Sequence, residues 1–151
     1  MAIRRSAFAR IGKFDTALGP GTLTMASEDM RAFADLLLSG GTIRYQPTAV
    51  THHFHRREYA DFEYHLYGYG AGLTAFYTGL LMDKPSLVIP LLRLAPKALM
   101  HLRDPEGPRF GGIGSTFPRE VLRAHRRGML KGPALYVASR WKTRKSRRAA
   151  I

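Results

Sequence analysis

Residues 59–81 restrict the possible folds more than any other stretch, because four glycines stand there among aromatic and aliphatic side chains. They are Gly68, Gly70, Gly72 and Gly79. We predict one helix over the whole stretch. Each glycine inside a helix costs about 1 kcal/mol relative to alanine. We therefore expect this helix to pack closely against another element or against a lipid surface.

Two helices are predicted before this stretch, at residues 4–11 and 28–39. The first places its apolar side chains on one side and is followed by Gly12, a typical helix stop. In the second, apolar residues recur every three or four positions, Ser27 is expected to act as the N-cap, and Gly40 follows the last turn.

The fold class predicted from the sequence is α+β and mostly helical. Residues 43–54 are expected to form one bent strand or two short strands, interrupted by Pro47. Three further helices are predicted at residues 86–102, 120–130 and 134–141, and we expect residues 142–148 to be frayed. Pro90 and Pro96 are expected to kink the first of these three.

Several classes of protein are excluded by composition. The chain has no cysteine, which excludes a disulfide framework, a thiol nucleophile and a cysteine-based zinc site. No apolar run reaches the roughly 18 residues that a membrane span requires, and no secretory signal is recognisable. We expect a cytoplasmic protein, either free or bound peripherally to the inner face of the membrane.

Positive charge is concentrated near the end of the chain. The formal net charge is +13, and residues 119–151 hold eleven Lys or Arg residues against the single Glu120, a net of +10. Such a segment favours nucleic acid or an anionic membrane as a partner. Residues 80–94 are strongly apolar with basic edges, which favours a position on the membrane surface over packing in a core.

The adjacent carboxylates Glu28 and Asp29 stand between a glycine-rich loop and an amphipathic helix. Acidic residues in a first helical turn often do no more than offset the helix dipole. A carboxylate beside a flexible loop can also act as a general base toward a hydroxyl group. The flanking motifs favour the second interpretation.

Seven short motifs follow one another in the order typical of the acceptor-side half of bacterial family 2 glycosyltransferases, which have a GT-A-type fold. They are Arg4-Arg5, Gly12-Lys13-Phe14-Asp15, Gly19-Pro20-Gly21-Thr22, Glu28-Asp29, Gly40, Tyr45-Gln46-Pro47 and His53-Phe54-His55-Arg56. Each motif alone is common, but their order is fairly specific. Residues 2–82 resemble this family.

The resemblance implies transfer of a sugar, with inversion, from a nucleotide-diphosphate donor to a hydroxyl acceptor. By the same resemblance, Asp29 would be the general base and Glu28 its neighbour in the acceptor site. Gly19, Gly21 and Thr22 would form the loop near the acceptor.

His53, His55 and Arg56 are candidates for contacts with the donor diphosphate or a divalent metal. On a strand, side chains two residues apart point to one face, so the two imidazoles would lie together. We favour the diphosphate for His55 and Arg56. The complete enzyme is expected to use Mg²⁺ or Mn²⁺, but the sequence assigns no metal ligand.

One departure from the family pattern concerns the helix that follows the acidic pair. The family often has an Asp two residues after the pair and an Arg four residues further on, whereas this chain has Arg31 and Asp35. Residues four apart share one helical face, so we expect a salt bridge between them.

The nucleotide-binding half of such enzymes, with its Asp-x-Asp motif, has no recognisable counterpart in the sequence. We therefore expect a C-terminal portion that is inactive alone and needs a partner supplying the other half. Its predicted parts are an acceptor-side segment, amphipathic helices, a linker and a basic helical tail, at residues 1–57, 58–103, 104–118 and 119–151.

Two alternatives remain open at this point. In the first alternative, the chain is a small, basic, non-catalytic protein that binds nucleic acid or an anionic membrane through residues 119–148. The third possibility is an inert remnant. Sensitivity of sugar transfer to Asp29→Asn is the property that separates the enzyme from both.

Overall fold

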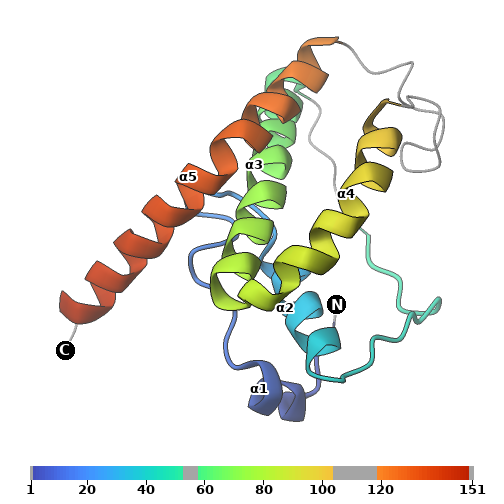
Figure 1. The fold of residues 1–151 in the computed structure, drawn as a ribbon, viewed down its shortest axis with the longest axis vertical. Coiled ribbons are helices and arrows are strands. Elements are labelled where there is room, and N and C mark those ends of the chain that lie inside the picture. The colour runs from blue at the N-terminus through green and yellow to red at the C-terminus, as the bar shows by residue number, and fades with distance from the viewer. Residues whose placement is uncertain (1, 53–57, 104–118, 150–151) are drawn as a thin grey trace.

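The described part of the chain is built from helices. The computed structural model describes residues 2–52, 58–103 and 119–149 (Figure 1). Its helices are α1 (Arg5–Ile11), α2 (Glu28–Leu38), α3 (Tyr59–Asp83), the 3-10 helix η1 (Pro85–Leu87), α4 (Val88–Arg103) and α5 (Arg119–Ala149). No helix in these ranges is both long enough and apolar enough to cross a membrane.

Helices α3 and α5 pack against each other and form the centre of the molecule (Figure 1). They run in the same direction, since Gly70 on α3 faces His125 and Gly79 faces Tyr136. A methyl group at Gly70 would collide with the main-chain oxygen of His125, and one at Gly128 with that of Tyr67. Close packing was therefore predicted correctly for Gly70 and Gly79, and the partner is another helix.

Helix α5 continues through Pro133, which corrects the prediction of two separate helices with a frayed end. Proline has no amide hydrogen, so the main-chain oxygen of Met129, four residues earlier, lacks its usual helical donor. The hydroxyl of Thr74 on α3 donates a 2.8 Å hydrogen bond to that oxygen. The close helix contact replaces the missing bond, and the helix is not interrupted.

The other helices begin and end close to the predicted residues. Gly12 and Gly40 have φ angles of +73° and +77° and follow the last residues of α1 and α2. The prediction of one helix at residues 86–102 is matched by η1 and α4, and Pro90 and Pro96 both lie within α4.

The strands predicted at residues 43–54 are not confirmed, because no strand occurs in the described residues, which include 43–52. The backbone there makes a turn, in which the amide of Ala49 donates to the main-chain oxygen of Gln46 at 3.1 Å. Tyr45 is 85% exposed. A strand needs a neighbour with which to exchange hydrogen bonds, and the described chain offers none beside this segment.

The loop between α1 and α2 is attached to α5. The main-chain oxygen of Ala17 accepts hydrogen bonds from the hydroxyls of Thr24, at 3.1 Å, and Ser139, at 2.8 Å. Ala17 and Leu18 share a buried cluster with residues of α3 and α5. The loop that leads to Glu28 and Asp29 is therefore fixed on the central helix pair.

Candidate functional site

Glu28 and Asp29 occupy the first turn of α2, and the backbone before them is unusual. Met25 and Ser27 have φ angles of +65° and +79°, the only positive values among the described residues other than glycine. Ser27 precedes the helix as predicted, but its side chain makes no capping hydrogen bond. Such left-handed conformations are costly and cluster at functional sites.

The approach of this loop to α3 depends on Gly72. A methyl group there would lie 2.8 Å from the side chains of both Ala26 and Ser27. Gly68, one turn earlier, faces Met25 in the same way, at 3.1 Å. Two of the helix glycines therefore hold the strained segment against α3, a role that the sequence did not indicate.

Asp29 is exposed, and one of its carboxylate oxygens is already held. Its Oδ1 accepts a 2.7 Å hydrogen bond from the amide of Met30. Within residues 2–52, 58–103 and 119–149 no ion pair involves Asp29. Its Oδ2 is consequently available to a ligand.

Glu28 lies over the loop glycine Gly19. A methyl group on Gly19 would lie 2.9 Å from both Cδ and Oε2 of Glu28, so the carboxyl group rests directly against the loop. Gly19 has a φ of +95°, a conformation that glycine adopts without strain. The structure thus brings these two predicted site residues together.

The acidic pair lines an open hollow of about 750 Å³. The predicted loop residues Gly21 and Thr22 line the same hollow, whereas Gly19 is buried beneath Glu28. The hydroxyl of Thr22 donates a 2.7 Å hydrogen bond to the main-chain oxygen of Gly19, which closes the loop on itself. Four of the predicted residues therefore share one cavity.

The opposite wall of the hollow comes from α3 and was missed by the sequence analysis. It consists of Tyr64, His65, Gly68 and Tyr69. The His65 ring lies 5.8 Å from the Tyr64 ring and 6.3 Å from the Tyr69 ring, measured between centroids. The spacing of one, four and five residues places these side chains on one helical face, a signal that groups them but does not identify the loop that they face.

The histidines and arginine proposed for the donor, His53, His55 and Arg56, lie outside the described residues. Among the residues that are described, no group of three or more His, Asp or Glu side chains could hold a metal ion. No ligand set for the expected Mg²⁺ or Mn²⁺ can therefore be assigned here.

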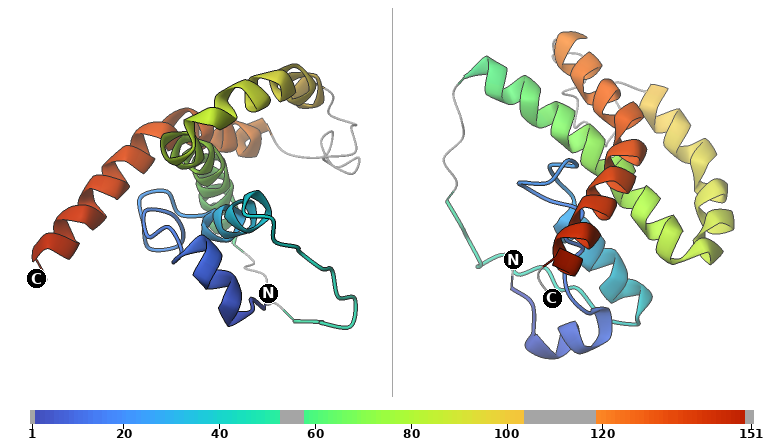
Figure 2. Two further views of the ribbon diagram at one scale, coloured as in Figure 1. Left: turned by 60° about the horizontal axis from the view of Figure 1, so that its bottom comes forward. Right: turned by 90° about the vertical axis from the view of Figure 1, so that its left-hand side faces the viewer.

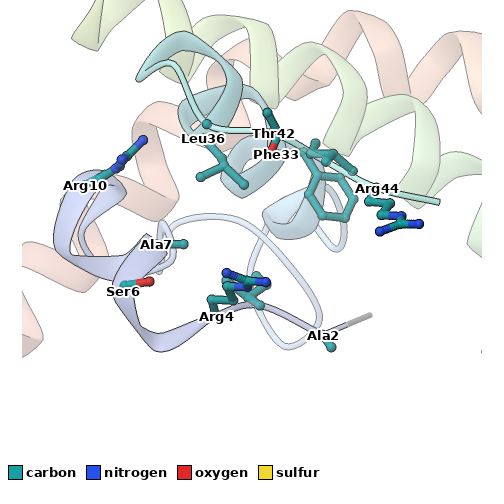
Figure 3. A pocket seen from close by; sticks show the side chains of 12 residues that line it. Ala2, Arg4, Ser6, Ala7, Arg10, Phe33, Leu36, Thr42 and Arg44 are labelled. Carbon is teal, nitrogen blue, oxygen red and sulfur yellow. The ribbon is translucent and has the colours of Figure 1, made fainter. Parts of the chain in front are cut away.

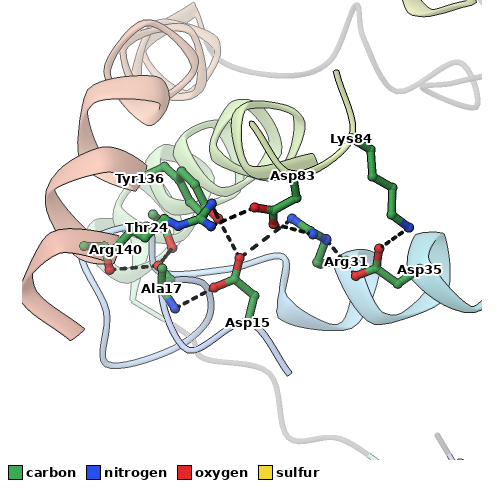
Figure 4. A network of polar contacts seen from close by, with 10 residues as sticks. Asp15, Ala17, Thr24, Arg31, Asp35, Asp83, Lys84, Tyr136 and Arg140 are labelled. Carbon is green, nitrogen blue, oxygen red and sulfur yellow. Dashed lines mark hydrogen bonds and ion pairs between the residues drawn. The ribbon is translucent and has the colours of Figure 1, made fainter. Parts of the chain in front are cut away.

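Arg31 is the centre of a charged network behind the site (Figure 4). It is only 6% exposed, and its guanidinium pairs with Asp35 and Asp83, each at 2.7 Å. The expected Arg31–Asp35 salt bridge is therefore confirmed. Burial alone would lower the pKa of Arg31, but the hydrogen bonds to Asp83 and Asp35 outweigh it and raise that pKa.

The same network reaches α5 through Asp83 and Asp15 (Figure 4). Arg140 donates a 2.7 Å hydrogen bond to Asp83, and the hydroxyl of Tyr136 donates a 2.8 Å hydrogen bond to Asp15. Burial and the bond to Asp15 raise the pKa of Tyr136 to about 12. The network joins the loop, α2, α3 and α5 into one support, and Arg31 is held by protein carboxylates rather than facing the hollow.

A second hollow, of about 490 Å³, lies between α1 and residues 41–44 (Figure 3). Arg4, Arg10 and Arg44 are on its wall, and Phe33 and Leu36 contribute apolar surface. All three arginines are exposed. None of the predicted site residues that the structure describes lines this hollow.

Comparison with protein-family models, with curated proteins and with solved structures finds no match to this chain.

Proposed function

We propose that this chain forms the acceptor side of a family 2-type glycosyltransferase, with Asp29 as the general base. One observation carries the proposal. Asp29 is an exposed carboxylate, with one oxygen held and the other available, at the edge of a 750 Å³ hollow. A carboxylate that merely offset the helix dipole would require neither the hollow nor the strained backbone before it.

The hollow suits a hydroxyl-bearing ligand such as a sugar. Exposed tyrosines on one wall offer flat faces to the apolar side of a sugar ring, since Tyr64 is 59% and Tyr69 is 58% exposed. Carboxylate and hydroxyl groups on the other wall, from Glu28, Asp29 and Thr22, offer polar contacts. Mixed walls of this kind are typical of small-molecule sites.

In the proposed reaction, Oδ2 of Asp29 accepts the proton of the acceptor hydroxyl as that oxygen attacks the anomeric carbon. A new carbon–oxygen bond forms on one face of the sugar while the bond to the nucleoside diphosphate breaks on the other. The configuration is therefore inverted, and the diphosphate leaves with the bonding electrons. Glu28, resting on Gly19, positions the loop beside the acceptor.

We assign binding of the nucleotide-sugar donor to residues outside 2–52, 58–103 and 119–149. In the complete enzyme, a divalent cation such as Mg²⁺ or Mn²⁺ would neutralise charge on the leaving diphosphate. We place that cation and the nucleotide on a separate donor-binding half. Residues 1–151 without that half are not expected to transfer sugar.

The test is complementation with the donor-binding half of a family 2 glycosyltransferase, followed by measurement of transfer from a labelled nucleotide sugar. We expect transfer with the native chain and a loss of at least about a hundredfold with Asp29→Asn, because general-base catalysis commonly contributes that much. Circular dichroism and thermal unfolding establish that the variant is folded.

Glu58→Gln is the matched control, because Glu58 is an exposed carboxylate that does not line the hollow. It should leave transfer unchanged. Normal transfer by Asp29→Asn in a complex that is active with the native chain excludes Asp29 as the base. An intermediate loss with Glu28→Gln is expected, since Glu28 acts through the loop.

A further inference from the structure

Helix α5 carries an apolar stripe on the face turned away from α3. Its large members are Leu130, Val137 and Trp141, which are 83%, 51% and 68% exposed. Ala134, also exposed, stands between them. At 100° per residue these four positions fall within an arc of roughly 60°. They form a continuous line along the helix, rather than scattered exposed residues.

The opposite face of α5 is the one used for packing. Gly128, Gly132, Tyr136 and Ser139 are buried there, against α3 and the loop that precedes α2. The apolar stripe therefore has no function in the described core. Figures 1 and 2 show that the C-terminal end of α5 projects away from the other helices.

Positive charge brackets the stripe at both ends. Arg126 and Arg127 precede Leu130 by about one turn, and Arg144 and Lys145 follow Trp141 by about one turn. All four are exposed. At 100° per residue they lie on the same outward half of the helix as the stripe.

One side of the stripe is also basic. Lys131 and Lys142 both lie on that side and are exposed, and no acidic residue occurs after Glu120 in α5. The ammonium group of Lys145 lies 5.7 Å from the centroid of the Trp141 ring. Apolar and cationic groups thus share one accessible face of the helix.

We propose that α5 docks lengthwise on an anionic phospholipid bilayer, with Leu130, Val137 and Trp141 inserted at the boundary between headgroups and acyl chains. The basic side chains around them would pair with lipid phosphates, which attract Lys and Arg near an anionic surface. This binding does not depend on sugar transfer.

The apolar stripe decides between a bilayer and the other polyanion suggested by the charge. Nucleic acid is held by cations on its phosphates and gains nothing from an aliphatic line of this kind along a helix. A bilayer uses both components, since buried apolar area and electrostatic attraction together determine the binding of an amphipathic helix. The face of α5 that carries the charge also carries the apolar stripe, so the proposed partner is a lipid bilayer.

The chain supplies its own reporter, because Trp141 is its only tryptophan. Vesicles of phosphatidylcholine with about one third phosphatidylglycerol should shift the fluorescence emission of Trp141 to the blue, and brominated acyl chains should quench it. Vesicles of phosphatidylcholine alone should do neither. Flotation of the full chain with the vesicles measures the bound fraction independently.

The decisive variant is the double substitution Leu130→Ser and Val137→Ser, which keeps every charge. Both side chains are more than half exposed, so folding should be preserved. We expect binding to anionic vesicles to weaken about tenfold or more, since these two side chains supply much of the apolar area that enters the bilayer. Binding to duplex DNA should stay unchanged.

A charge-matched pair separates the face from the overall positive charge. Arg144→Gln with Lys145→Gln should weaken vesicle binding, whereas Arg4→Gln with Arg10→Gln removes equal charge at and just before α1 and should have a much smaller effect. Unchanged Trp141 emission and quenching on anionic vesicles, or equal vesicle binding by the serine variant and the native chain, overturns the proposal. Binding to duplex DNA without binding to anionic vesicles also overturns it.

Discussion

The hydroxyl of Thr74 on α3 donates a 2.8 Å hydrogen bond to the main-chain oxygen of Met129 on α5. Met129 stands four residues before Pro133, so this is the oxygen that the proline leaves without a helical donor. Two helices that pack through glycines are therefore also joined by a hydroxyl that replaces a main-chain amide.

Thr74→Val should lower the free energy of unfolding by about 1–2 kcal/mol, because it removes the donor while keeping the shape of the side chain. In a Pro133→Ala background the restored amide of residue 133 supplies the bond instead. There the same substitution should cost only a few tenths of a kcal/mol. Urea unfolding of the four proteins measures the coupling, and an equal cost in both backgrounds contradicts it.

Gly128→Ala should destabilise the protein despite the higher helix propensity of alanine. Propensity alone favours alanine by about 1 kcal/mol. The added methyl group would collide with the main-chain oxygen of Tyr67, and backbone atoms cannot move aside cheaply. We expect a net loss of about 1–3 kcal/mol in chemical unfolding.

Ala134→Gly is the control for that substitution, since Ala134 is exposed on the same helix. It should cost only about 1 kcal/mol, the propensity difference by itself. A stabilising Gly128→Ala would mean that α3 and α5 are further apart than the structure places them.

Acid should weaken the fold through Asp83. Burial alone would raise the pKa of this carboxyl, but hydrogen bonds from Arg31 and Arg140 outweigh it and bring that pKa below its usual 3.8. A lowered pKa in the folded state means that the stabilisation is present above the unfolded value and is lost as pH falls through the folded one. Protonation also leaves the buried Arg31 with one charged partner fewer.

The free energy of unfolding should consequently decrease between about pH 5 and pH 2. In Asp83→Asn the decrease should be shallower over the same range, although the variant is less stable at neutral pH. Urea unfolding at several pH values gives both slopes. Identical slopes would show that Asp83 does not contribute to the acid sensitivity.

Local signals predicted the helices well, and distant contacts account for what they missed. Gly12 and Gly40 marked the ends of α1 and α2 because each adopts a positive φ just beyond a helix. The pairing of Arg31 with Asp35 followed from their spacing of four residues. Such features depend only on neighbours within one helical turn.

The continuity of α5 could not be predicted from local sequence, because it depends on Thr74, 55 residues before Met129. The ion pair of Arg31 with Asp83 likewise joins residues 52 apart. The wrong prediction for α5 and the missed ion pair have the same cause, because in each a polar group on one helix is completed by a residue of another.

The candidate site was predicted in part. The motifs identified the wall formed by Glu28, Asp29 and the loop, since those residues are close in sequence. The wall formed by Tyr64 and His65 was missed, because only the packing of α3 against the loop brings it to the hollow. Gly68 and Gly72, the residues that permit this packing, indicated a close contact but not its partner.

Gly19→Ala tests whether the loop positions Glu28. The substitution introduces two penalties, a left-handed backbone at φ +95° and a methyl group 2.9 Å from the Glu28 carboxyl carbon. Gly21→Ala introduces only the first, because Gly21 has a φ of +81° and no atom within 4 Å of the added carbon. Backbone strain alone should cost each variant about 1–2 kcal/mol.

Gly19→Ala should therefore be the less stable of the two, and the difference should disappear when Glu28→Ala is added to both. Amide chemical shifts of Glu28 and Asp29 should move in the Gly19 variant and stay near their native values in the Gly21 variant. If both variants lose the same stability and show the same amide chemical shifts for Glu28 and Asp29, the Glu28 side chain does not rest on the loop. Its positioning role in the proposed site would then have no structural basis.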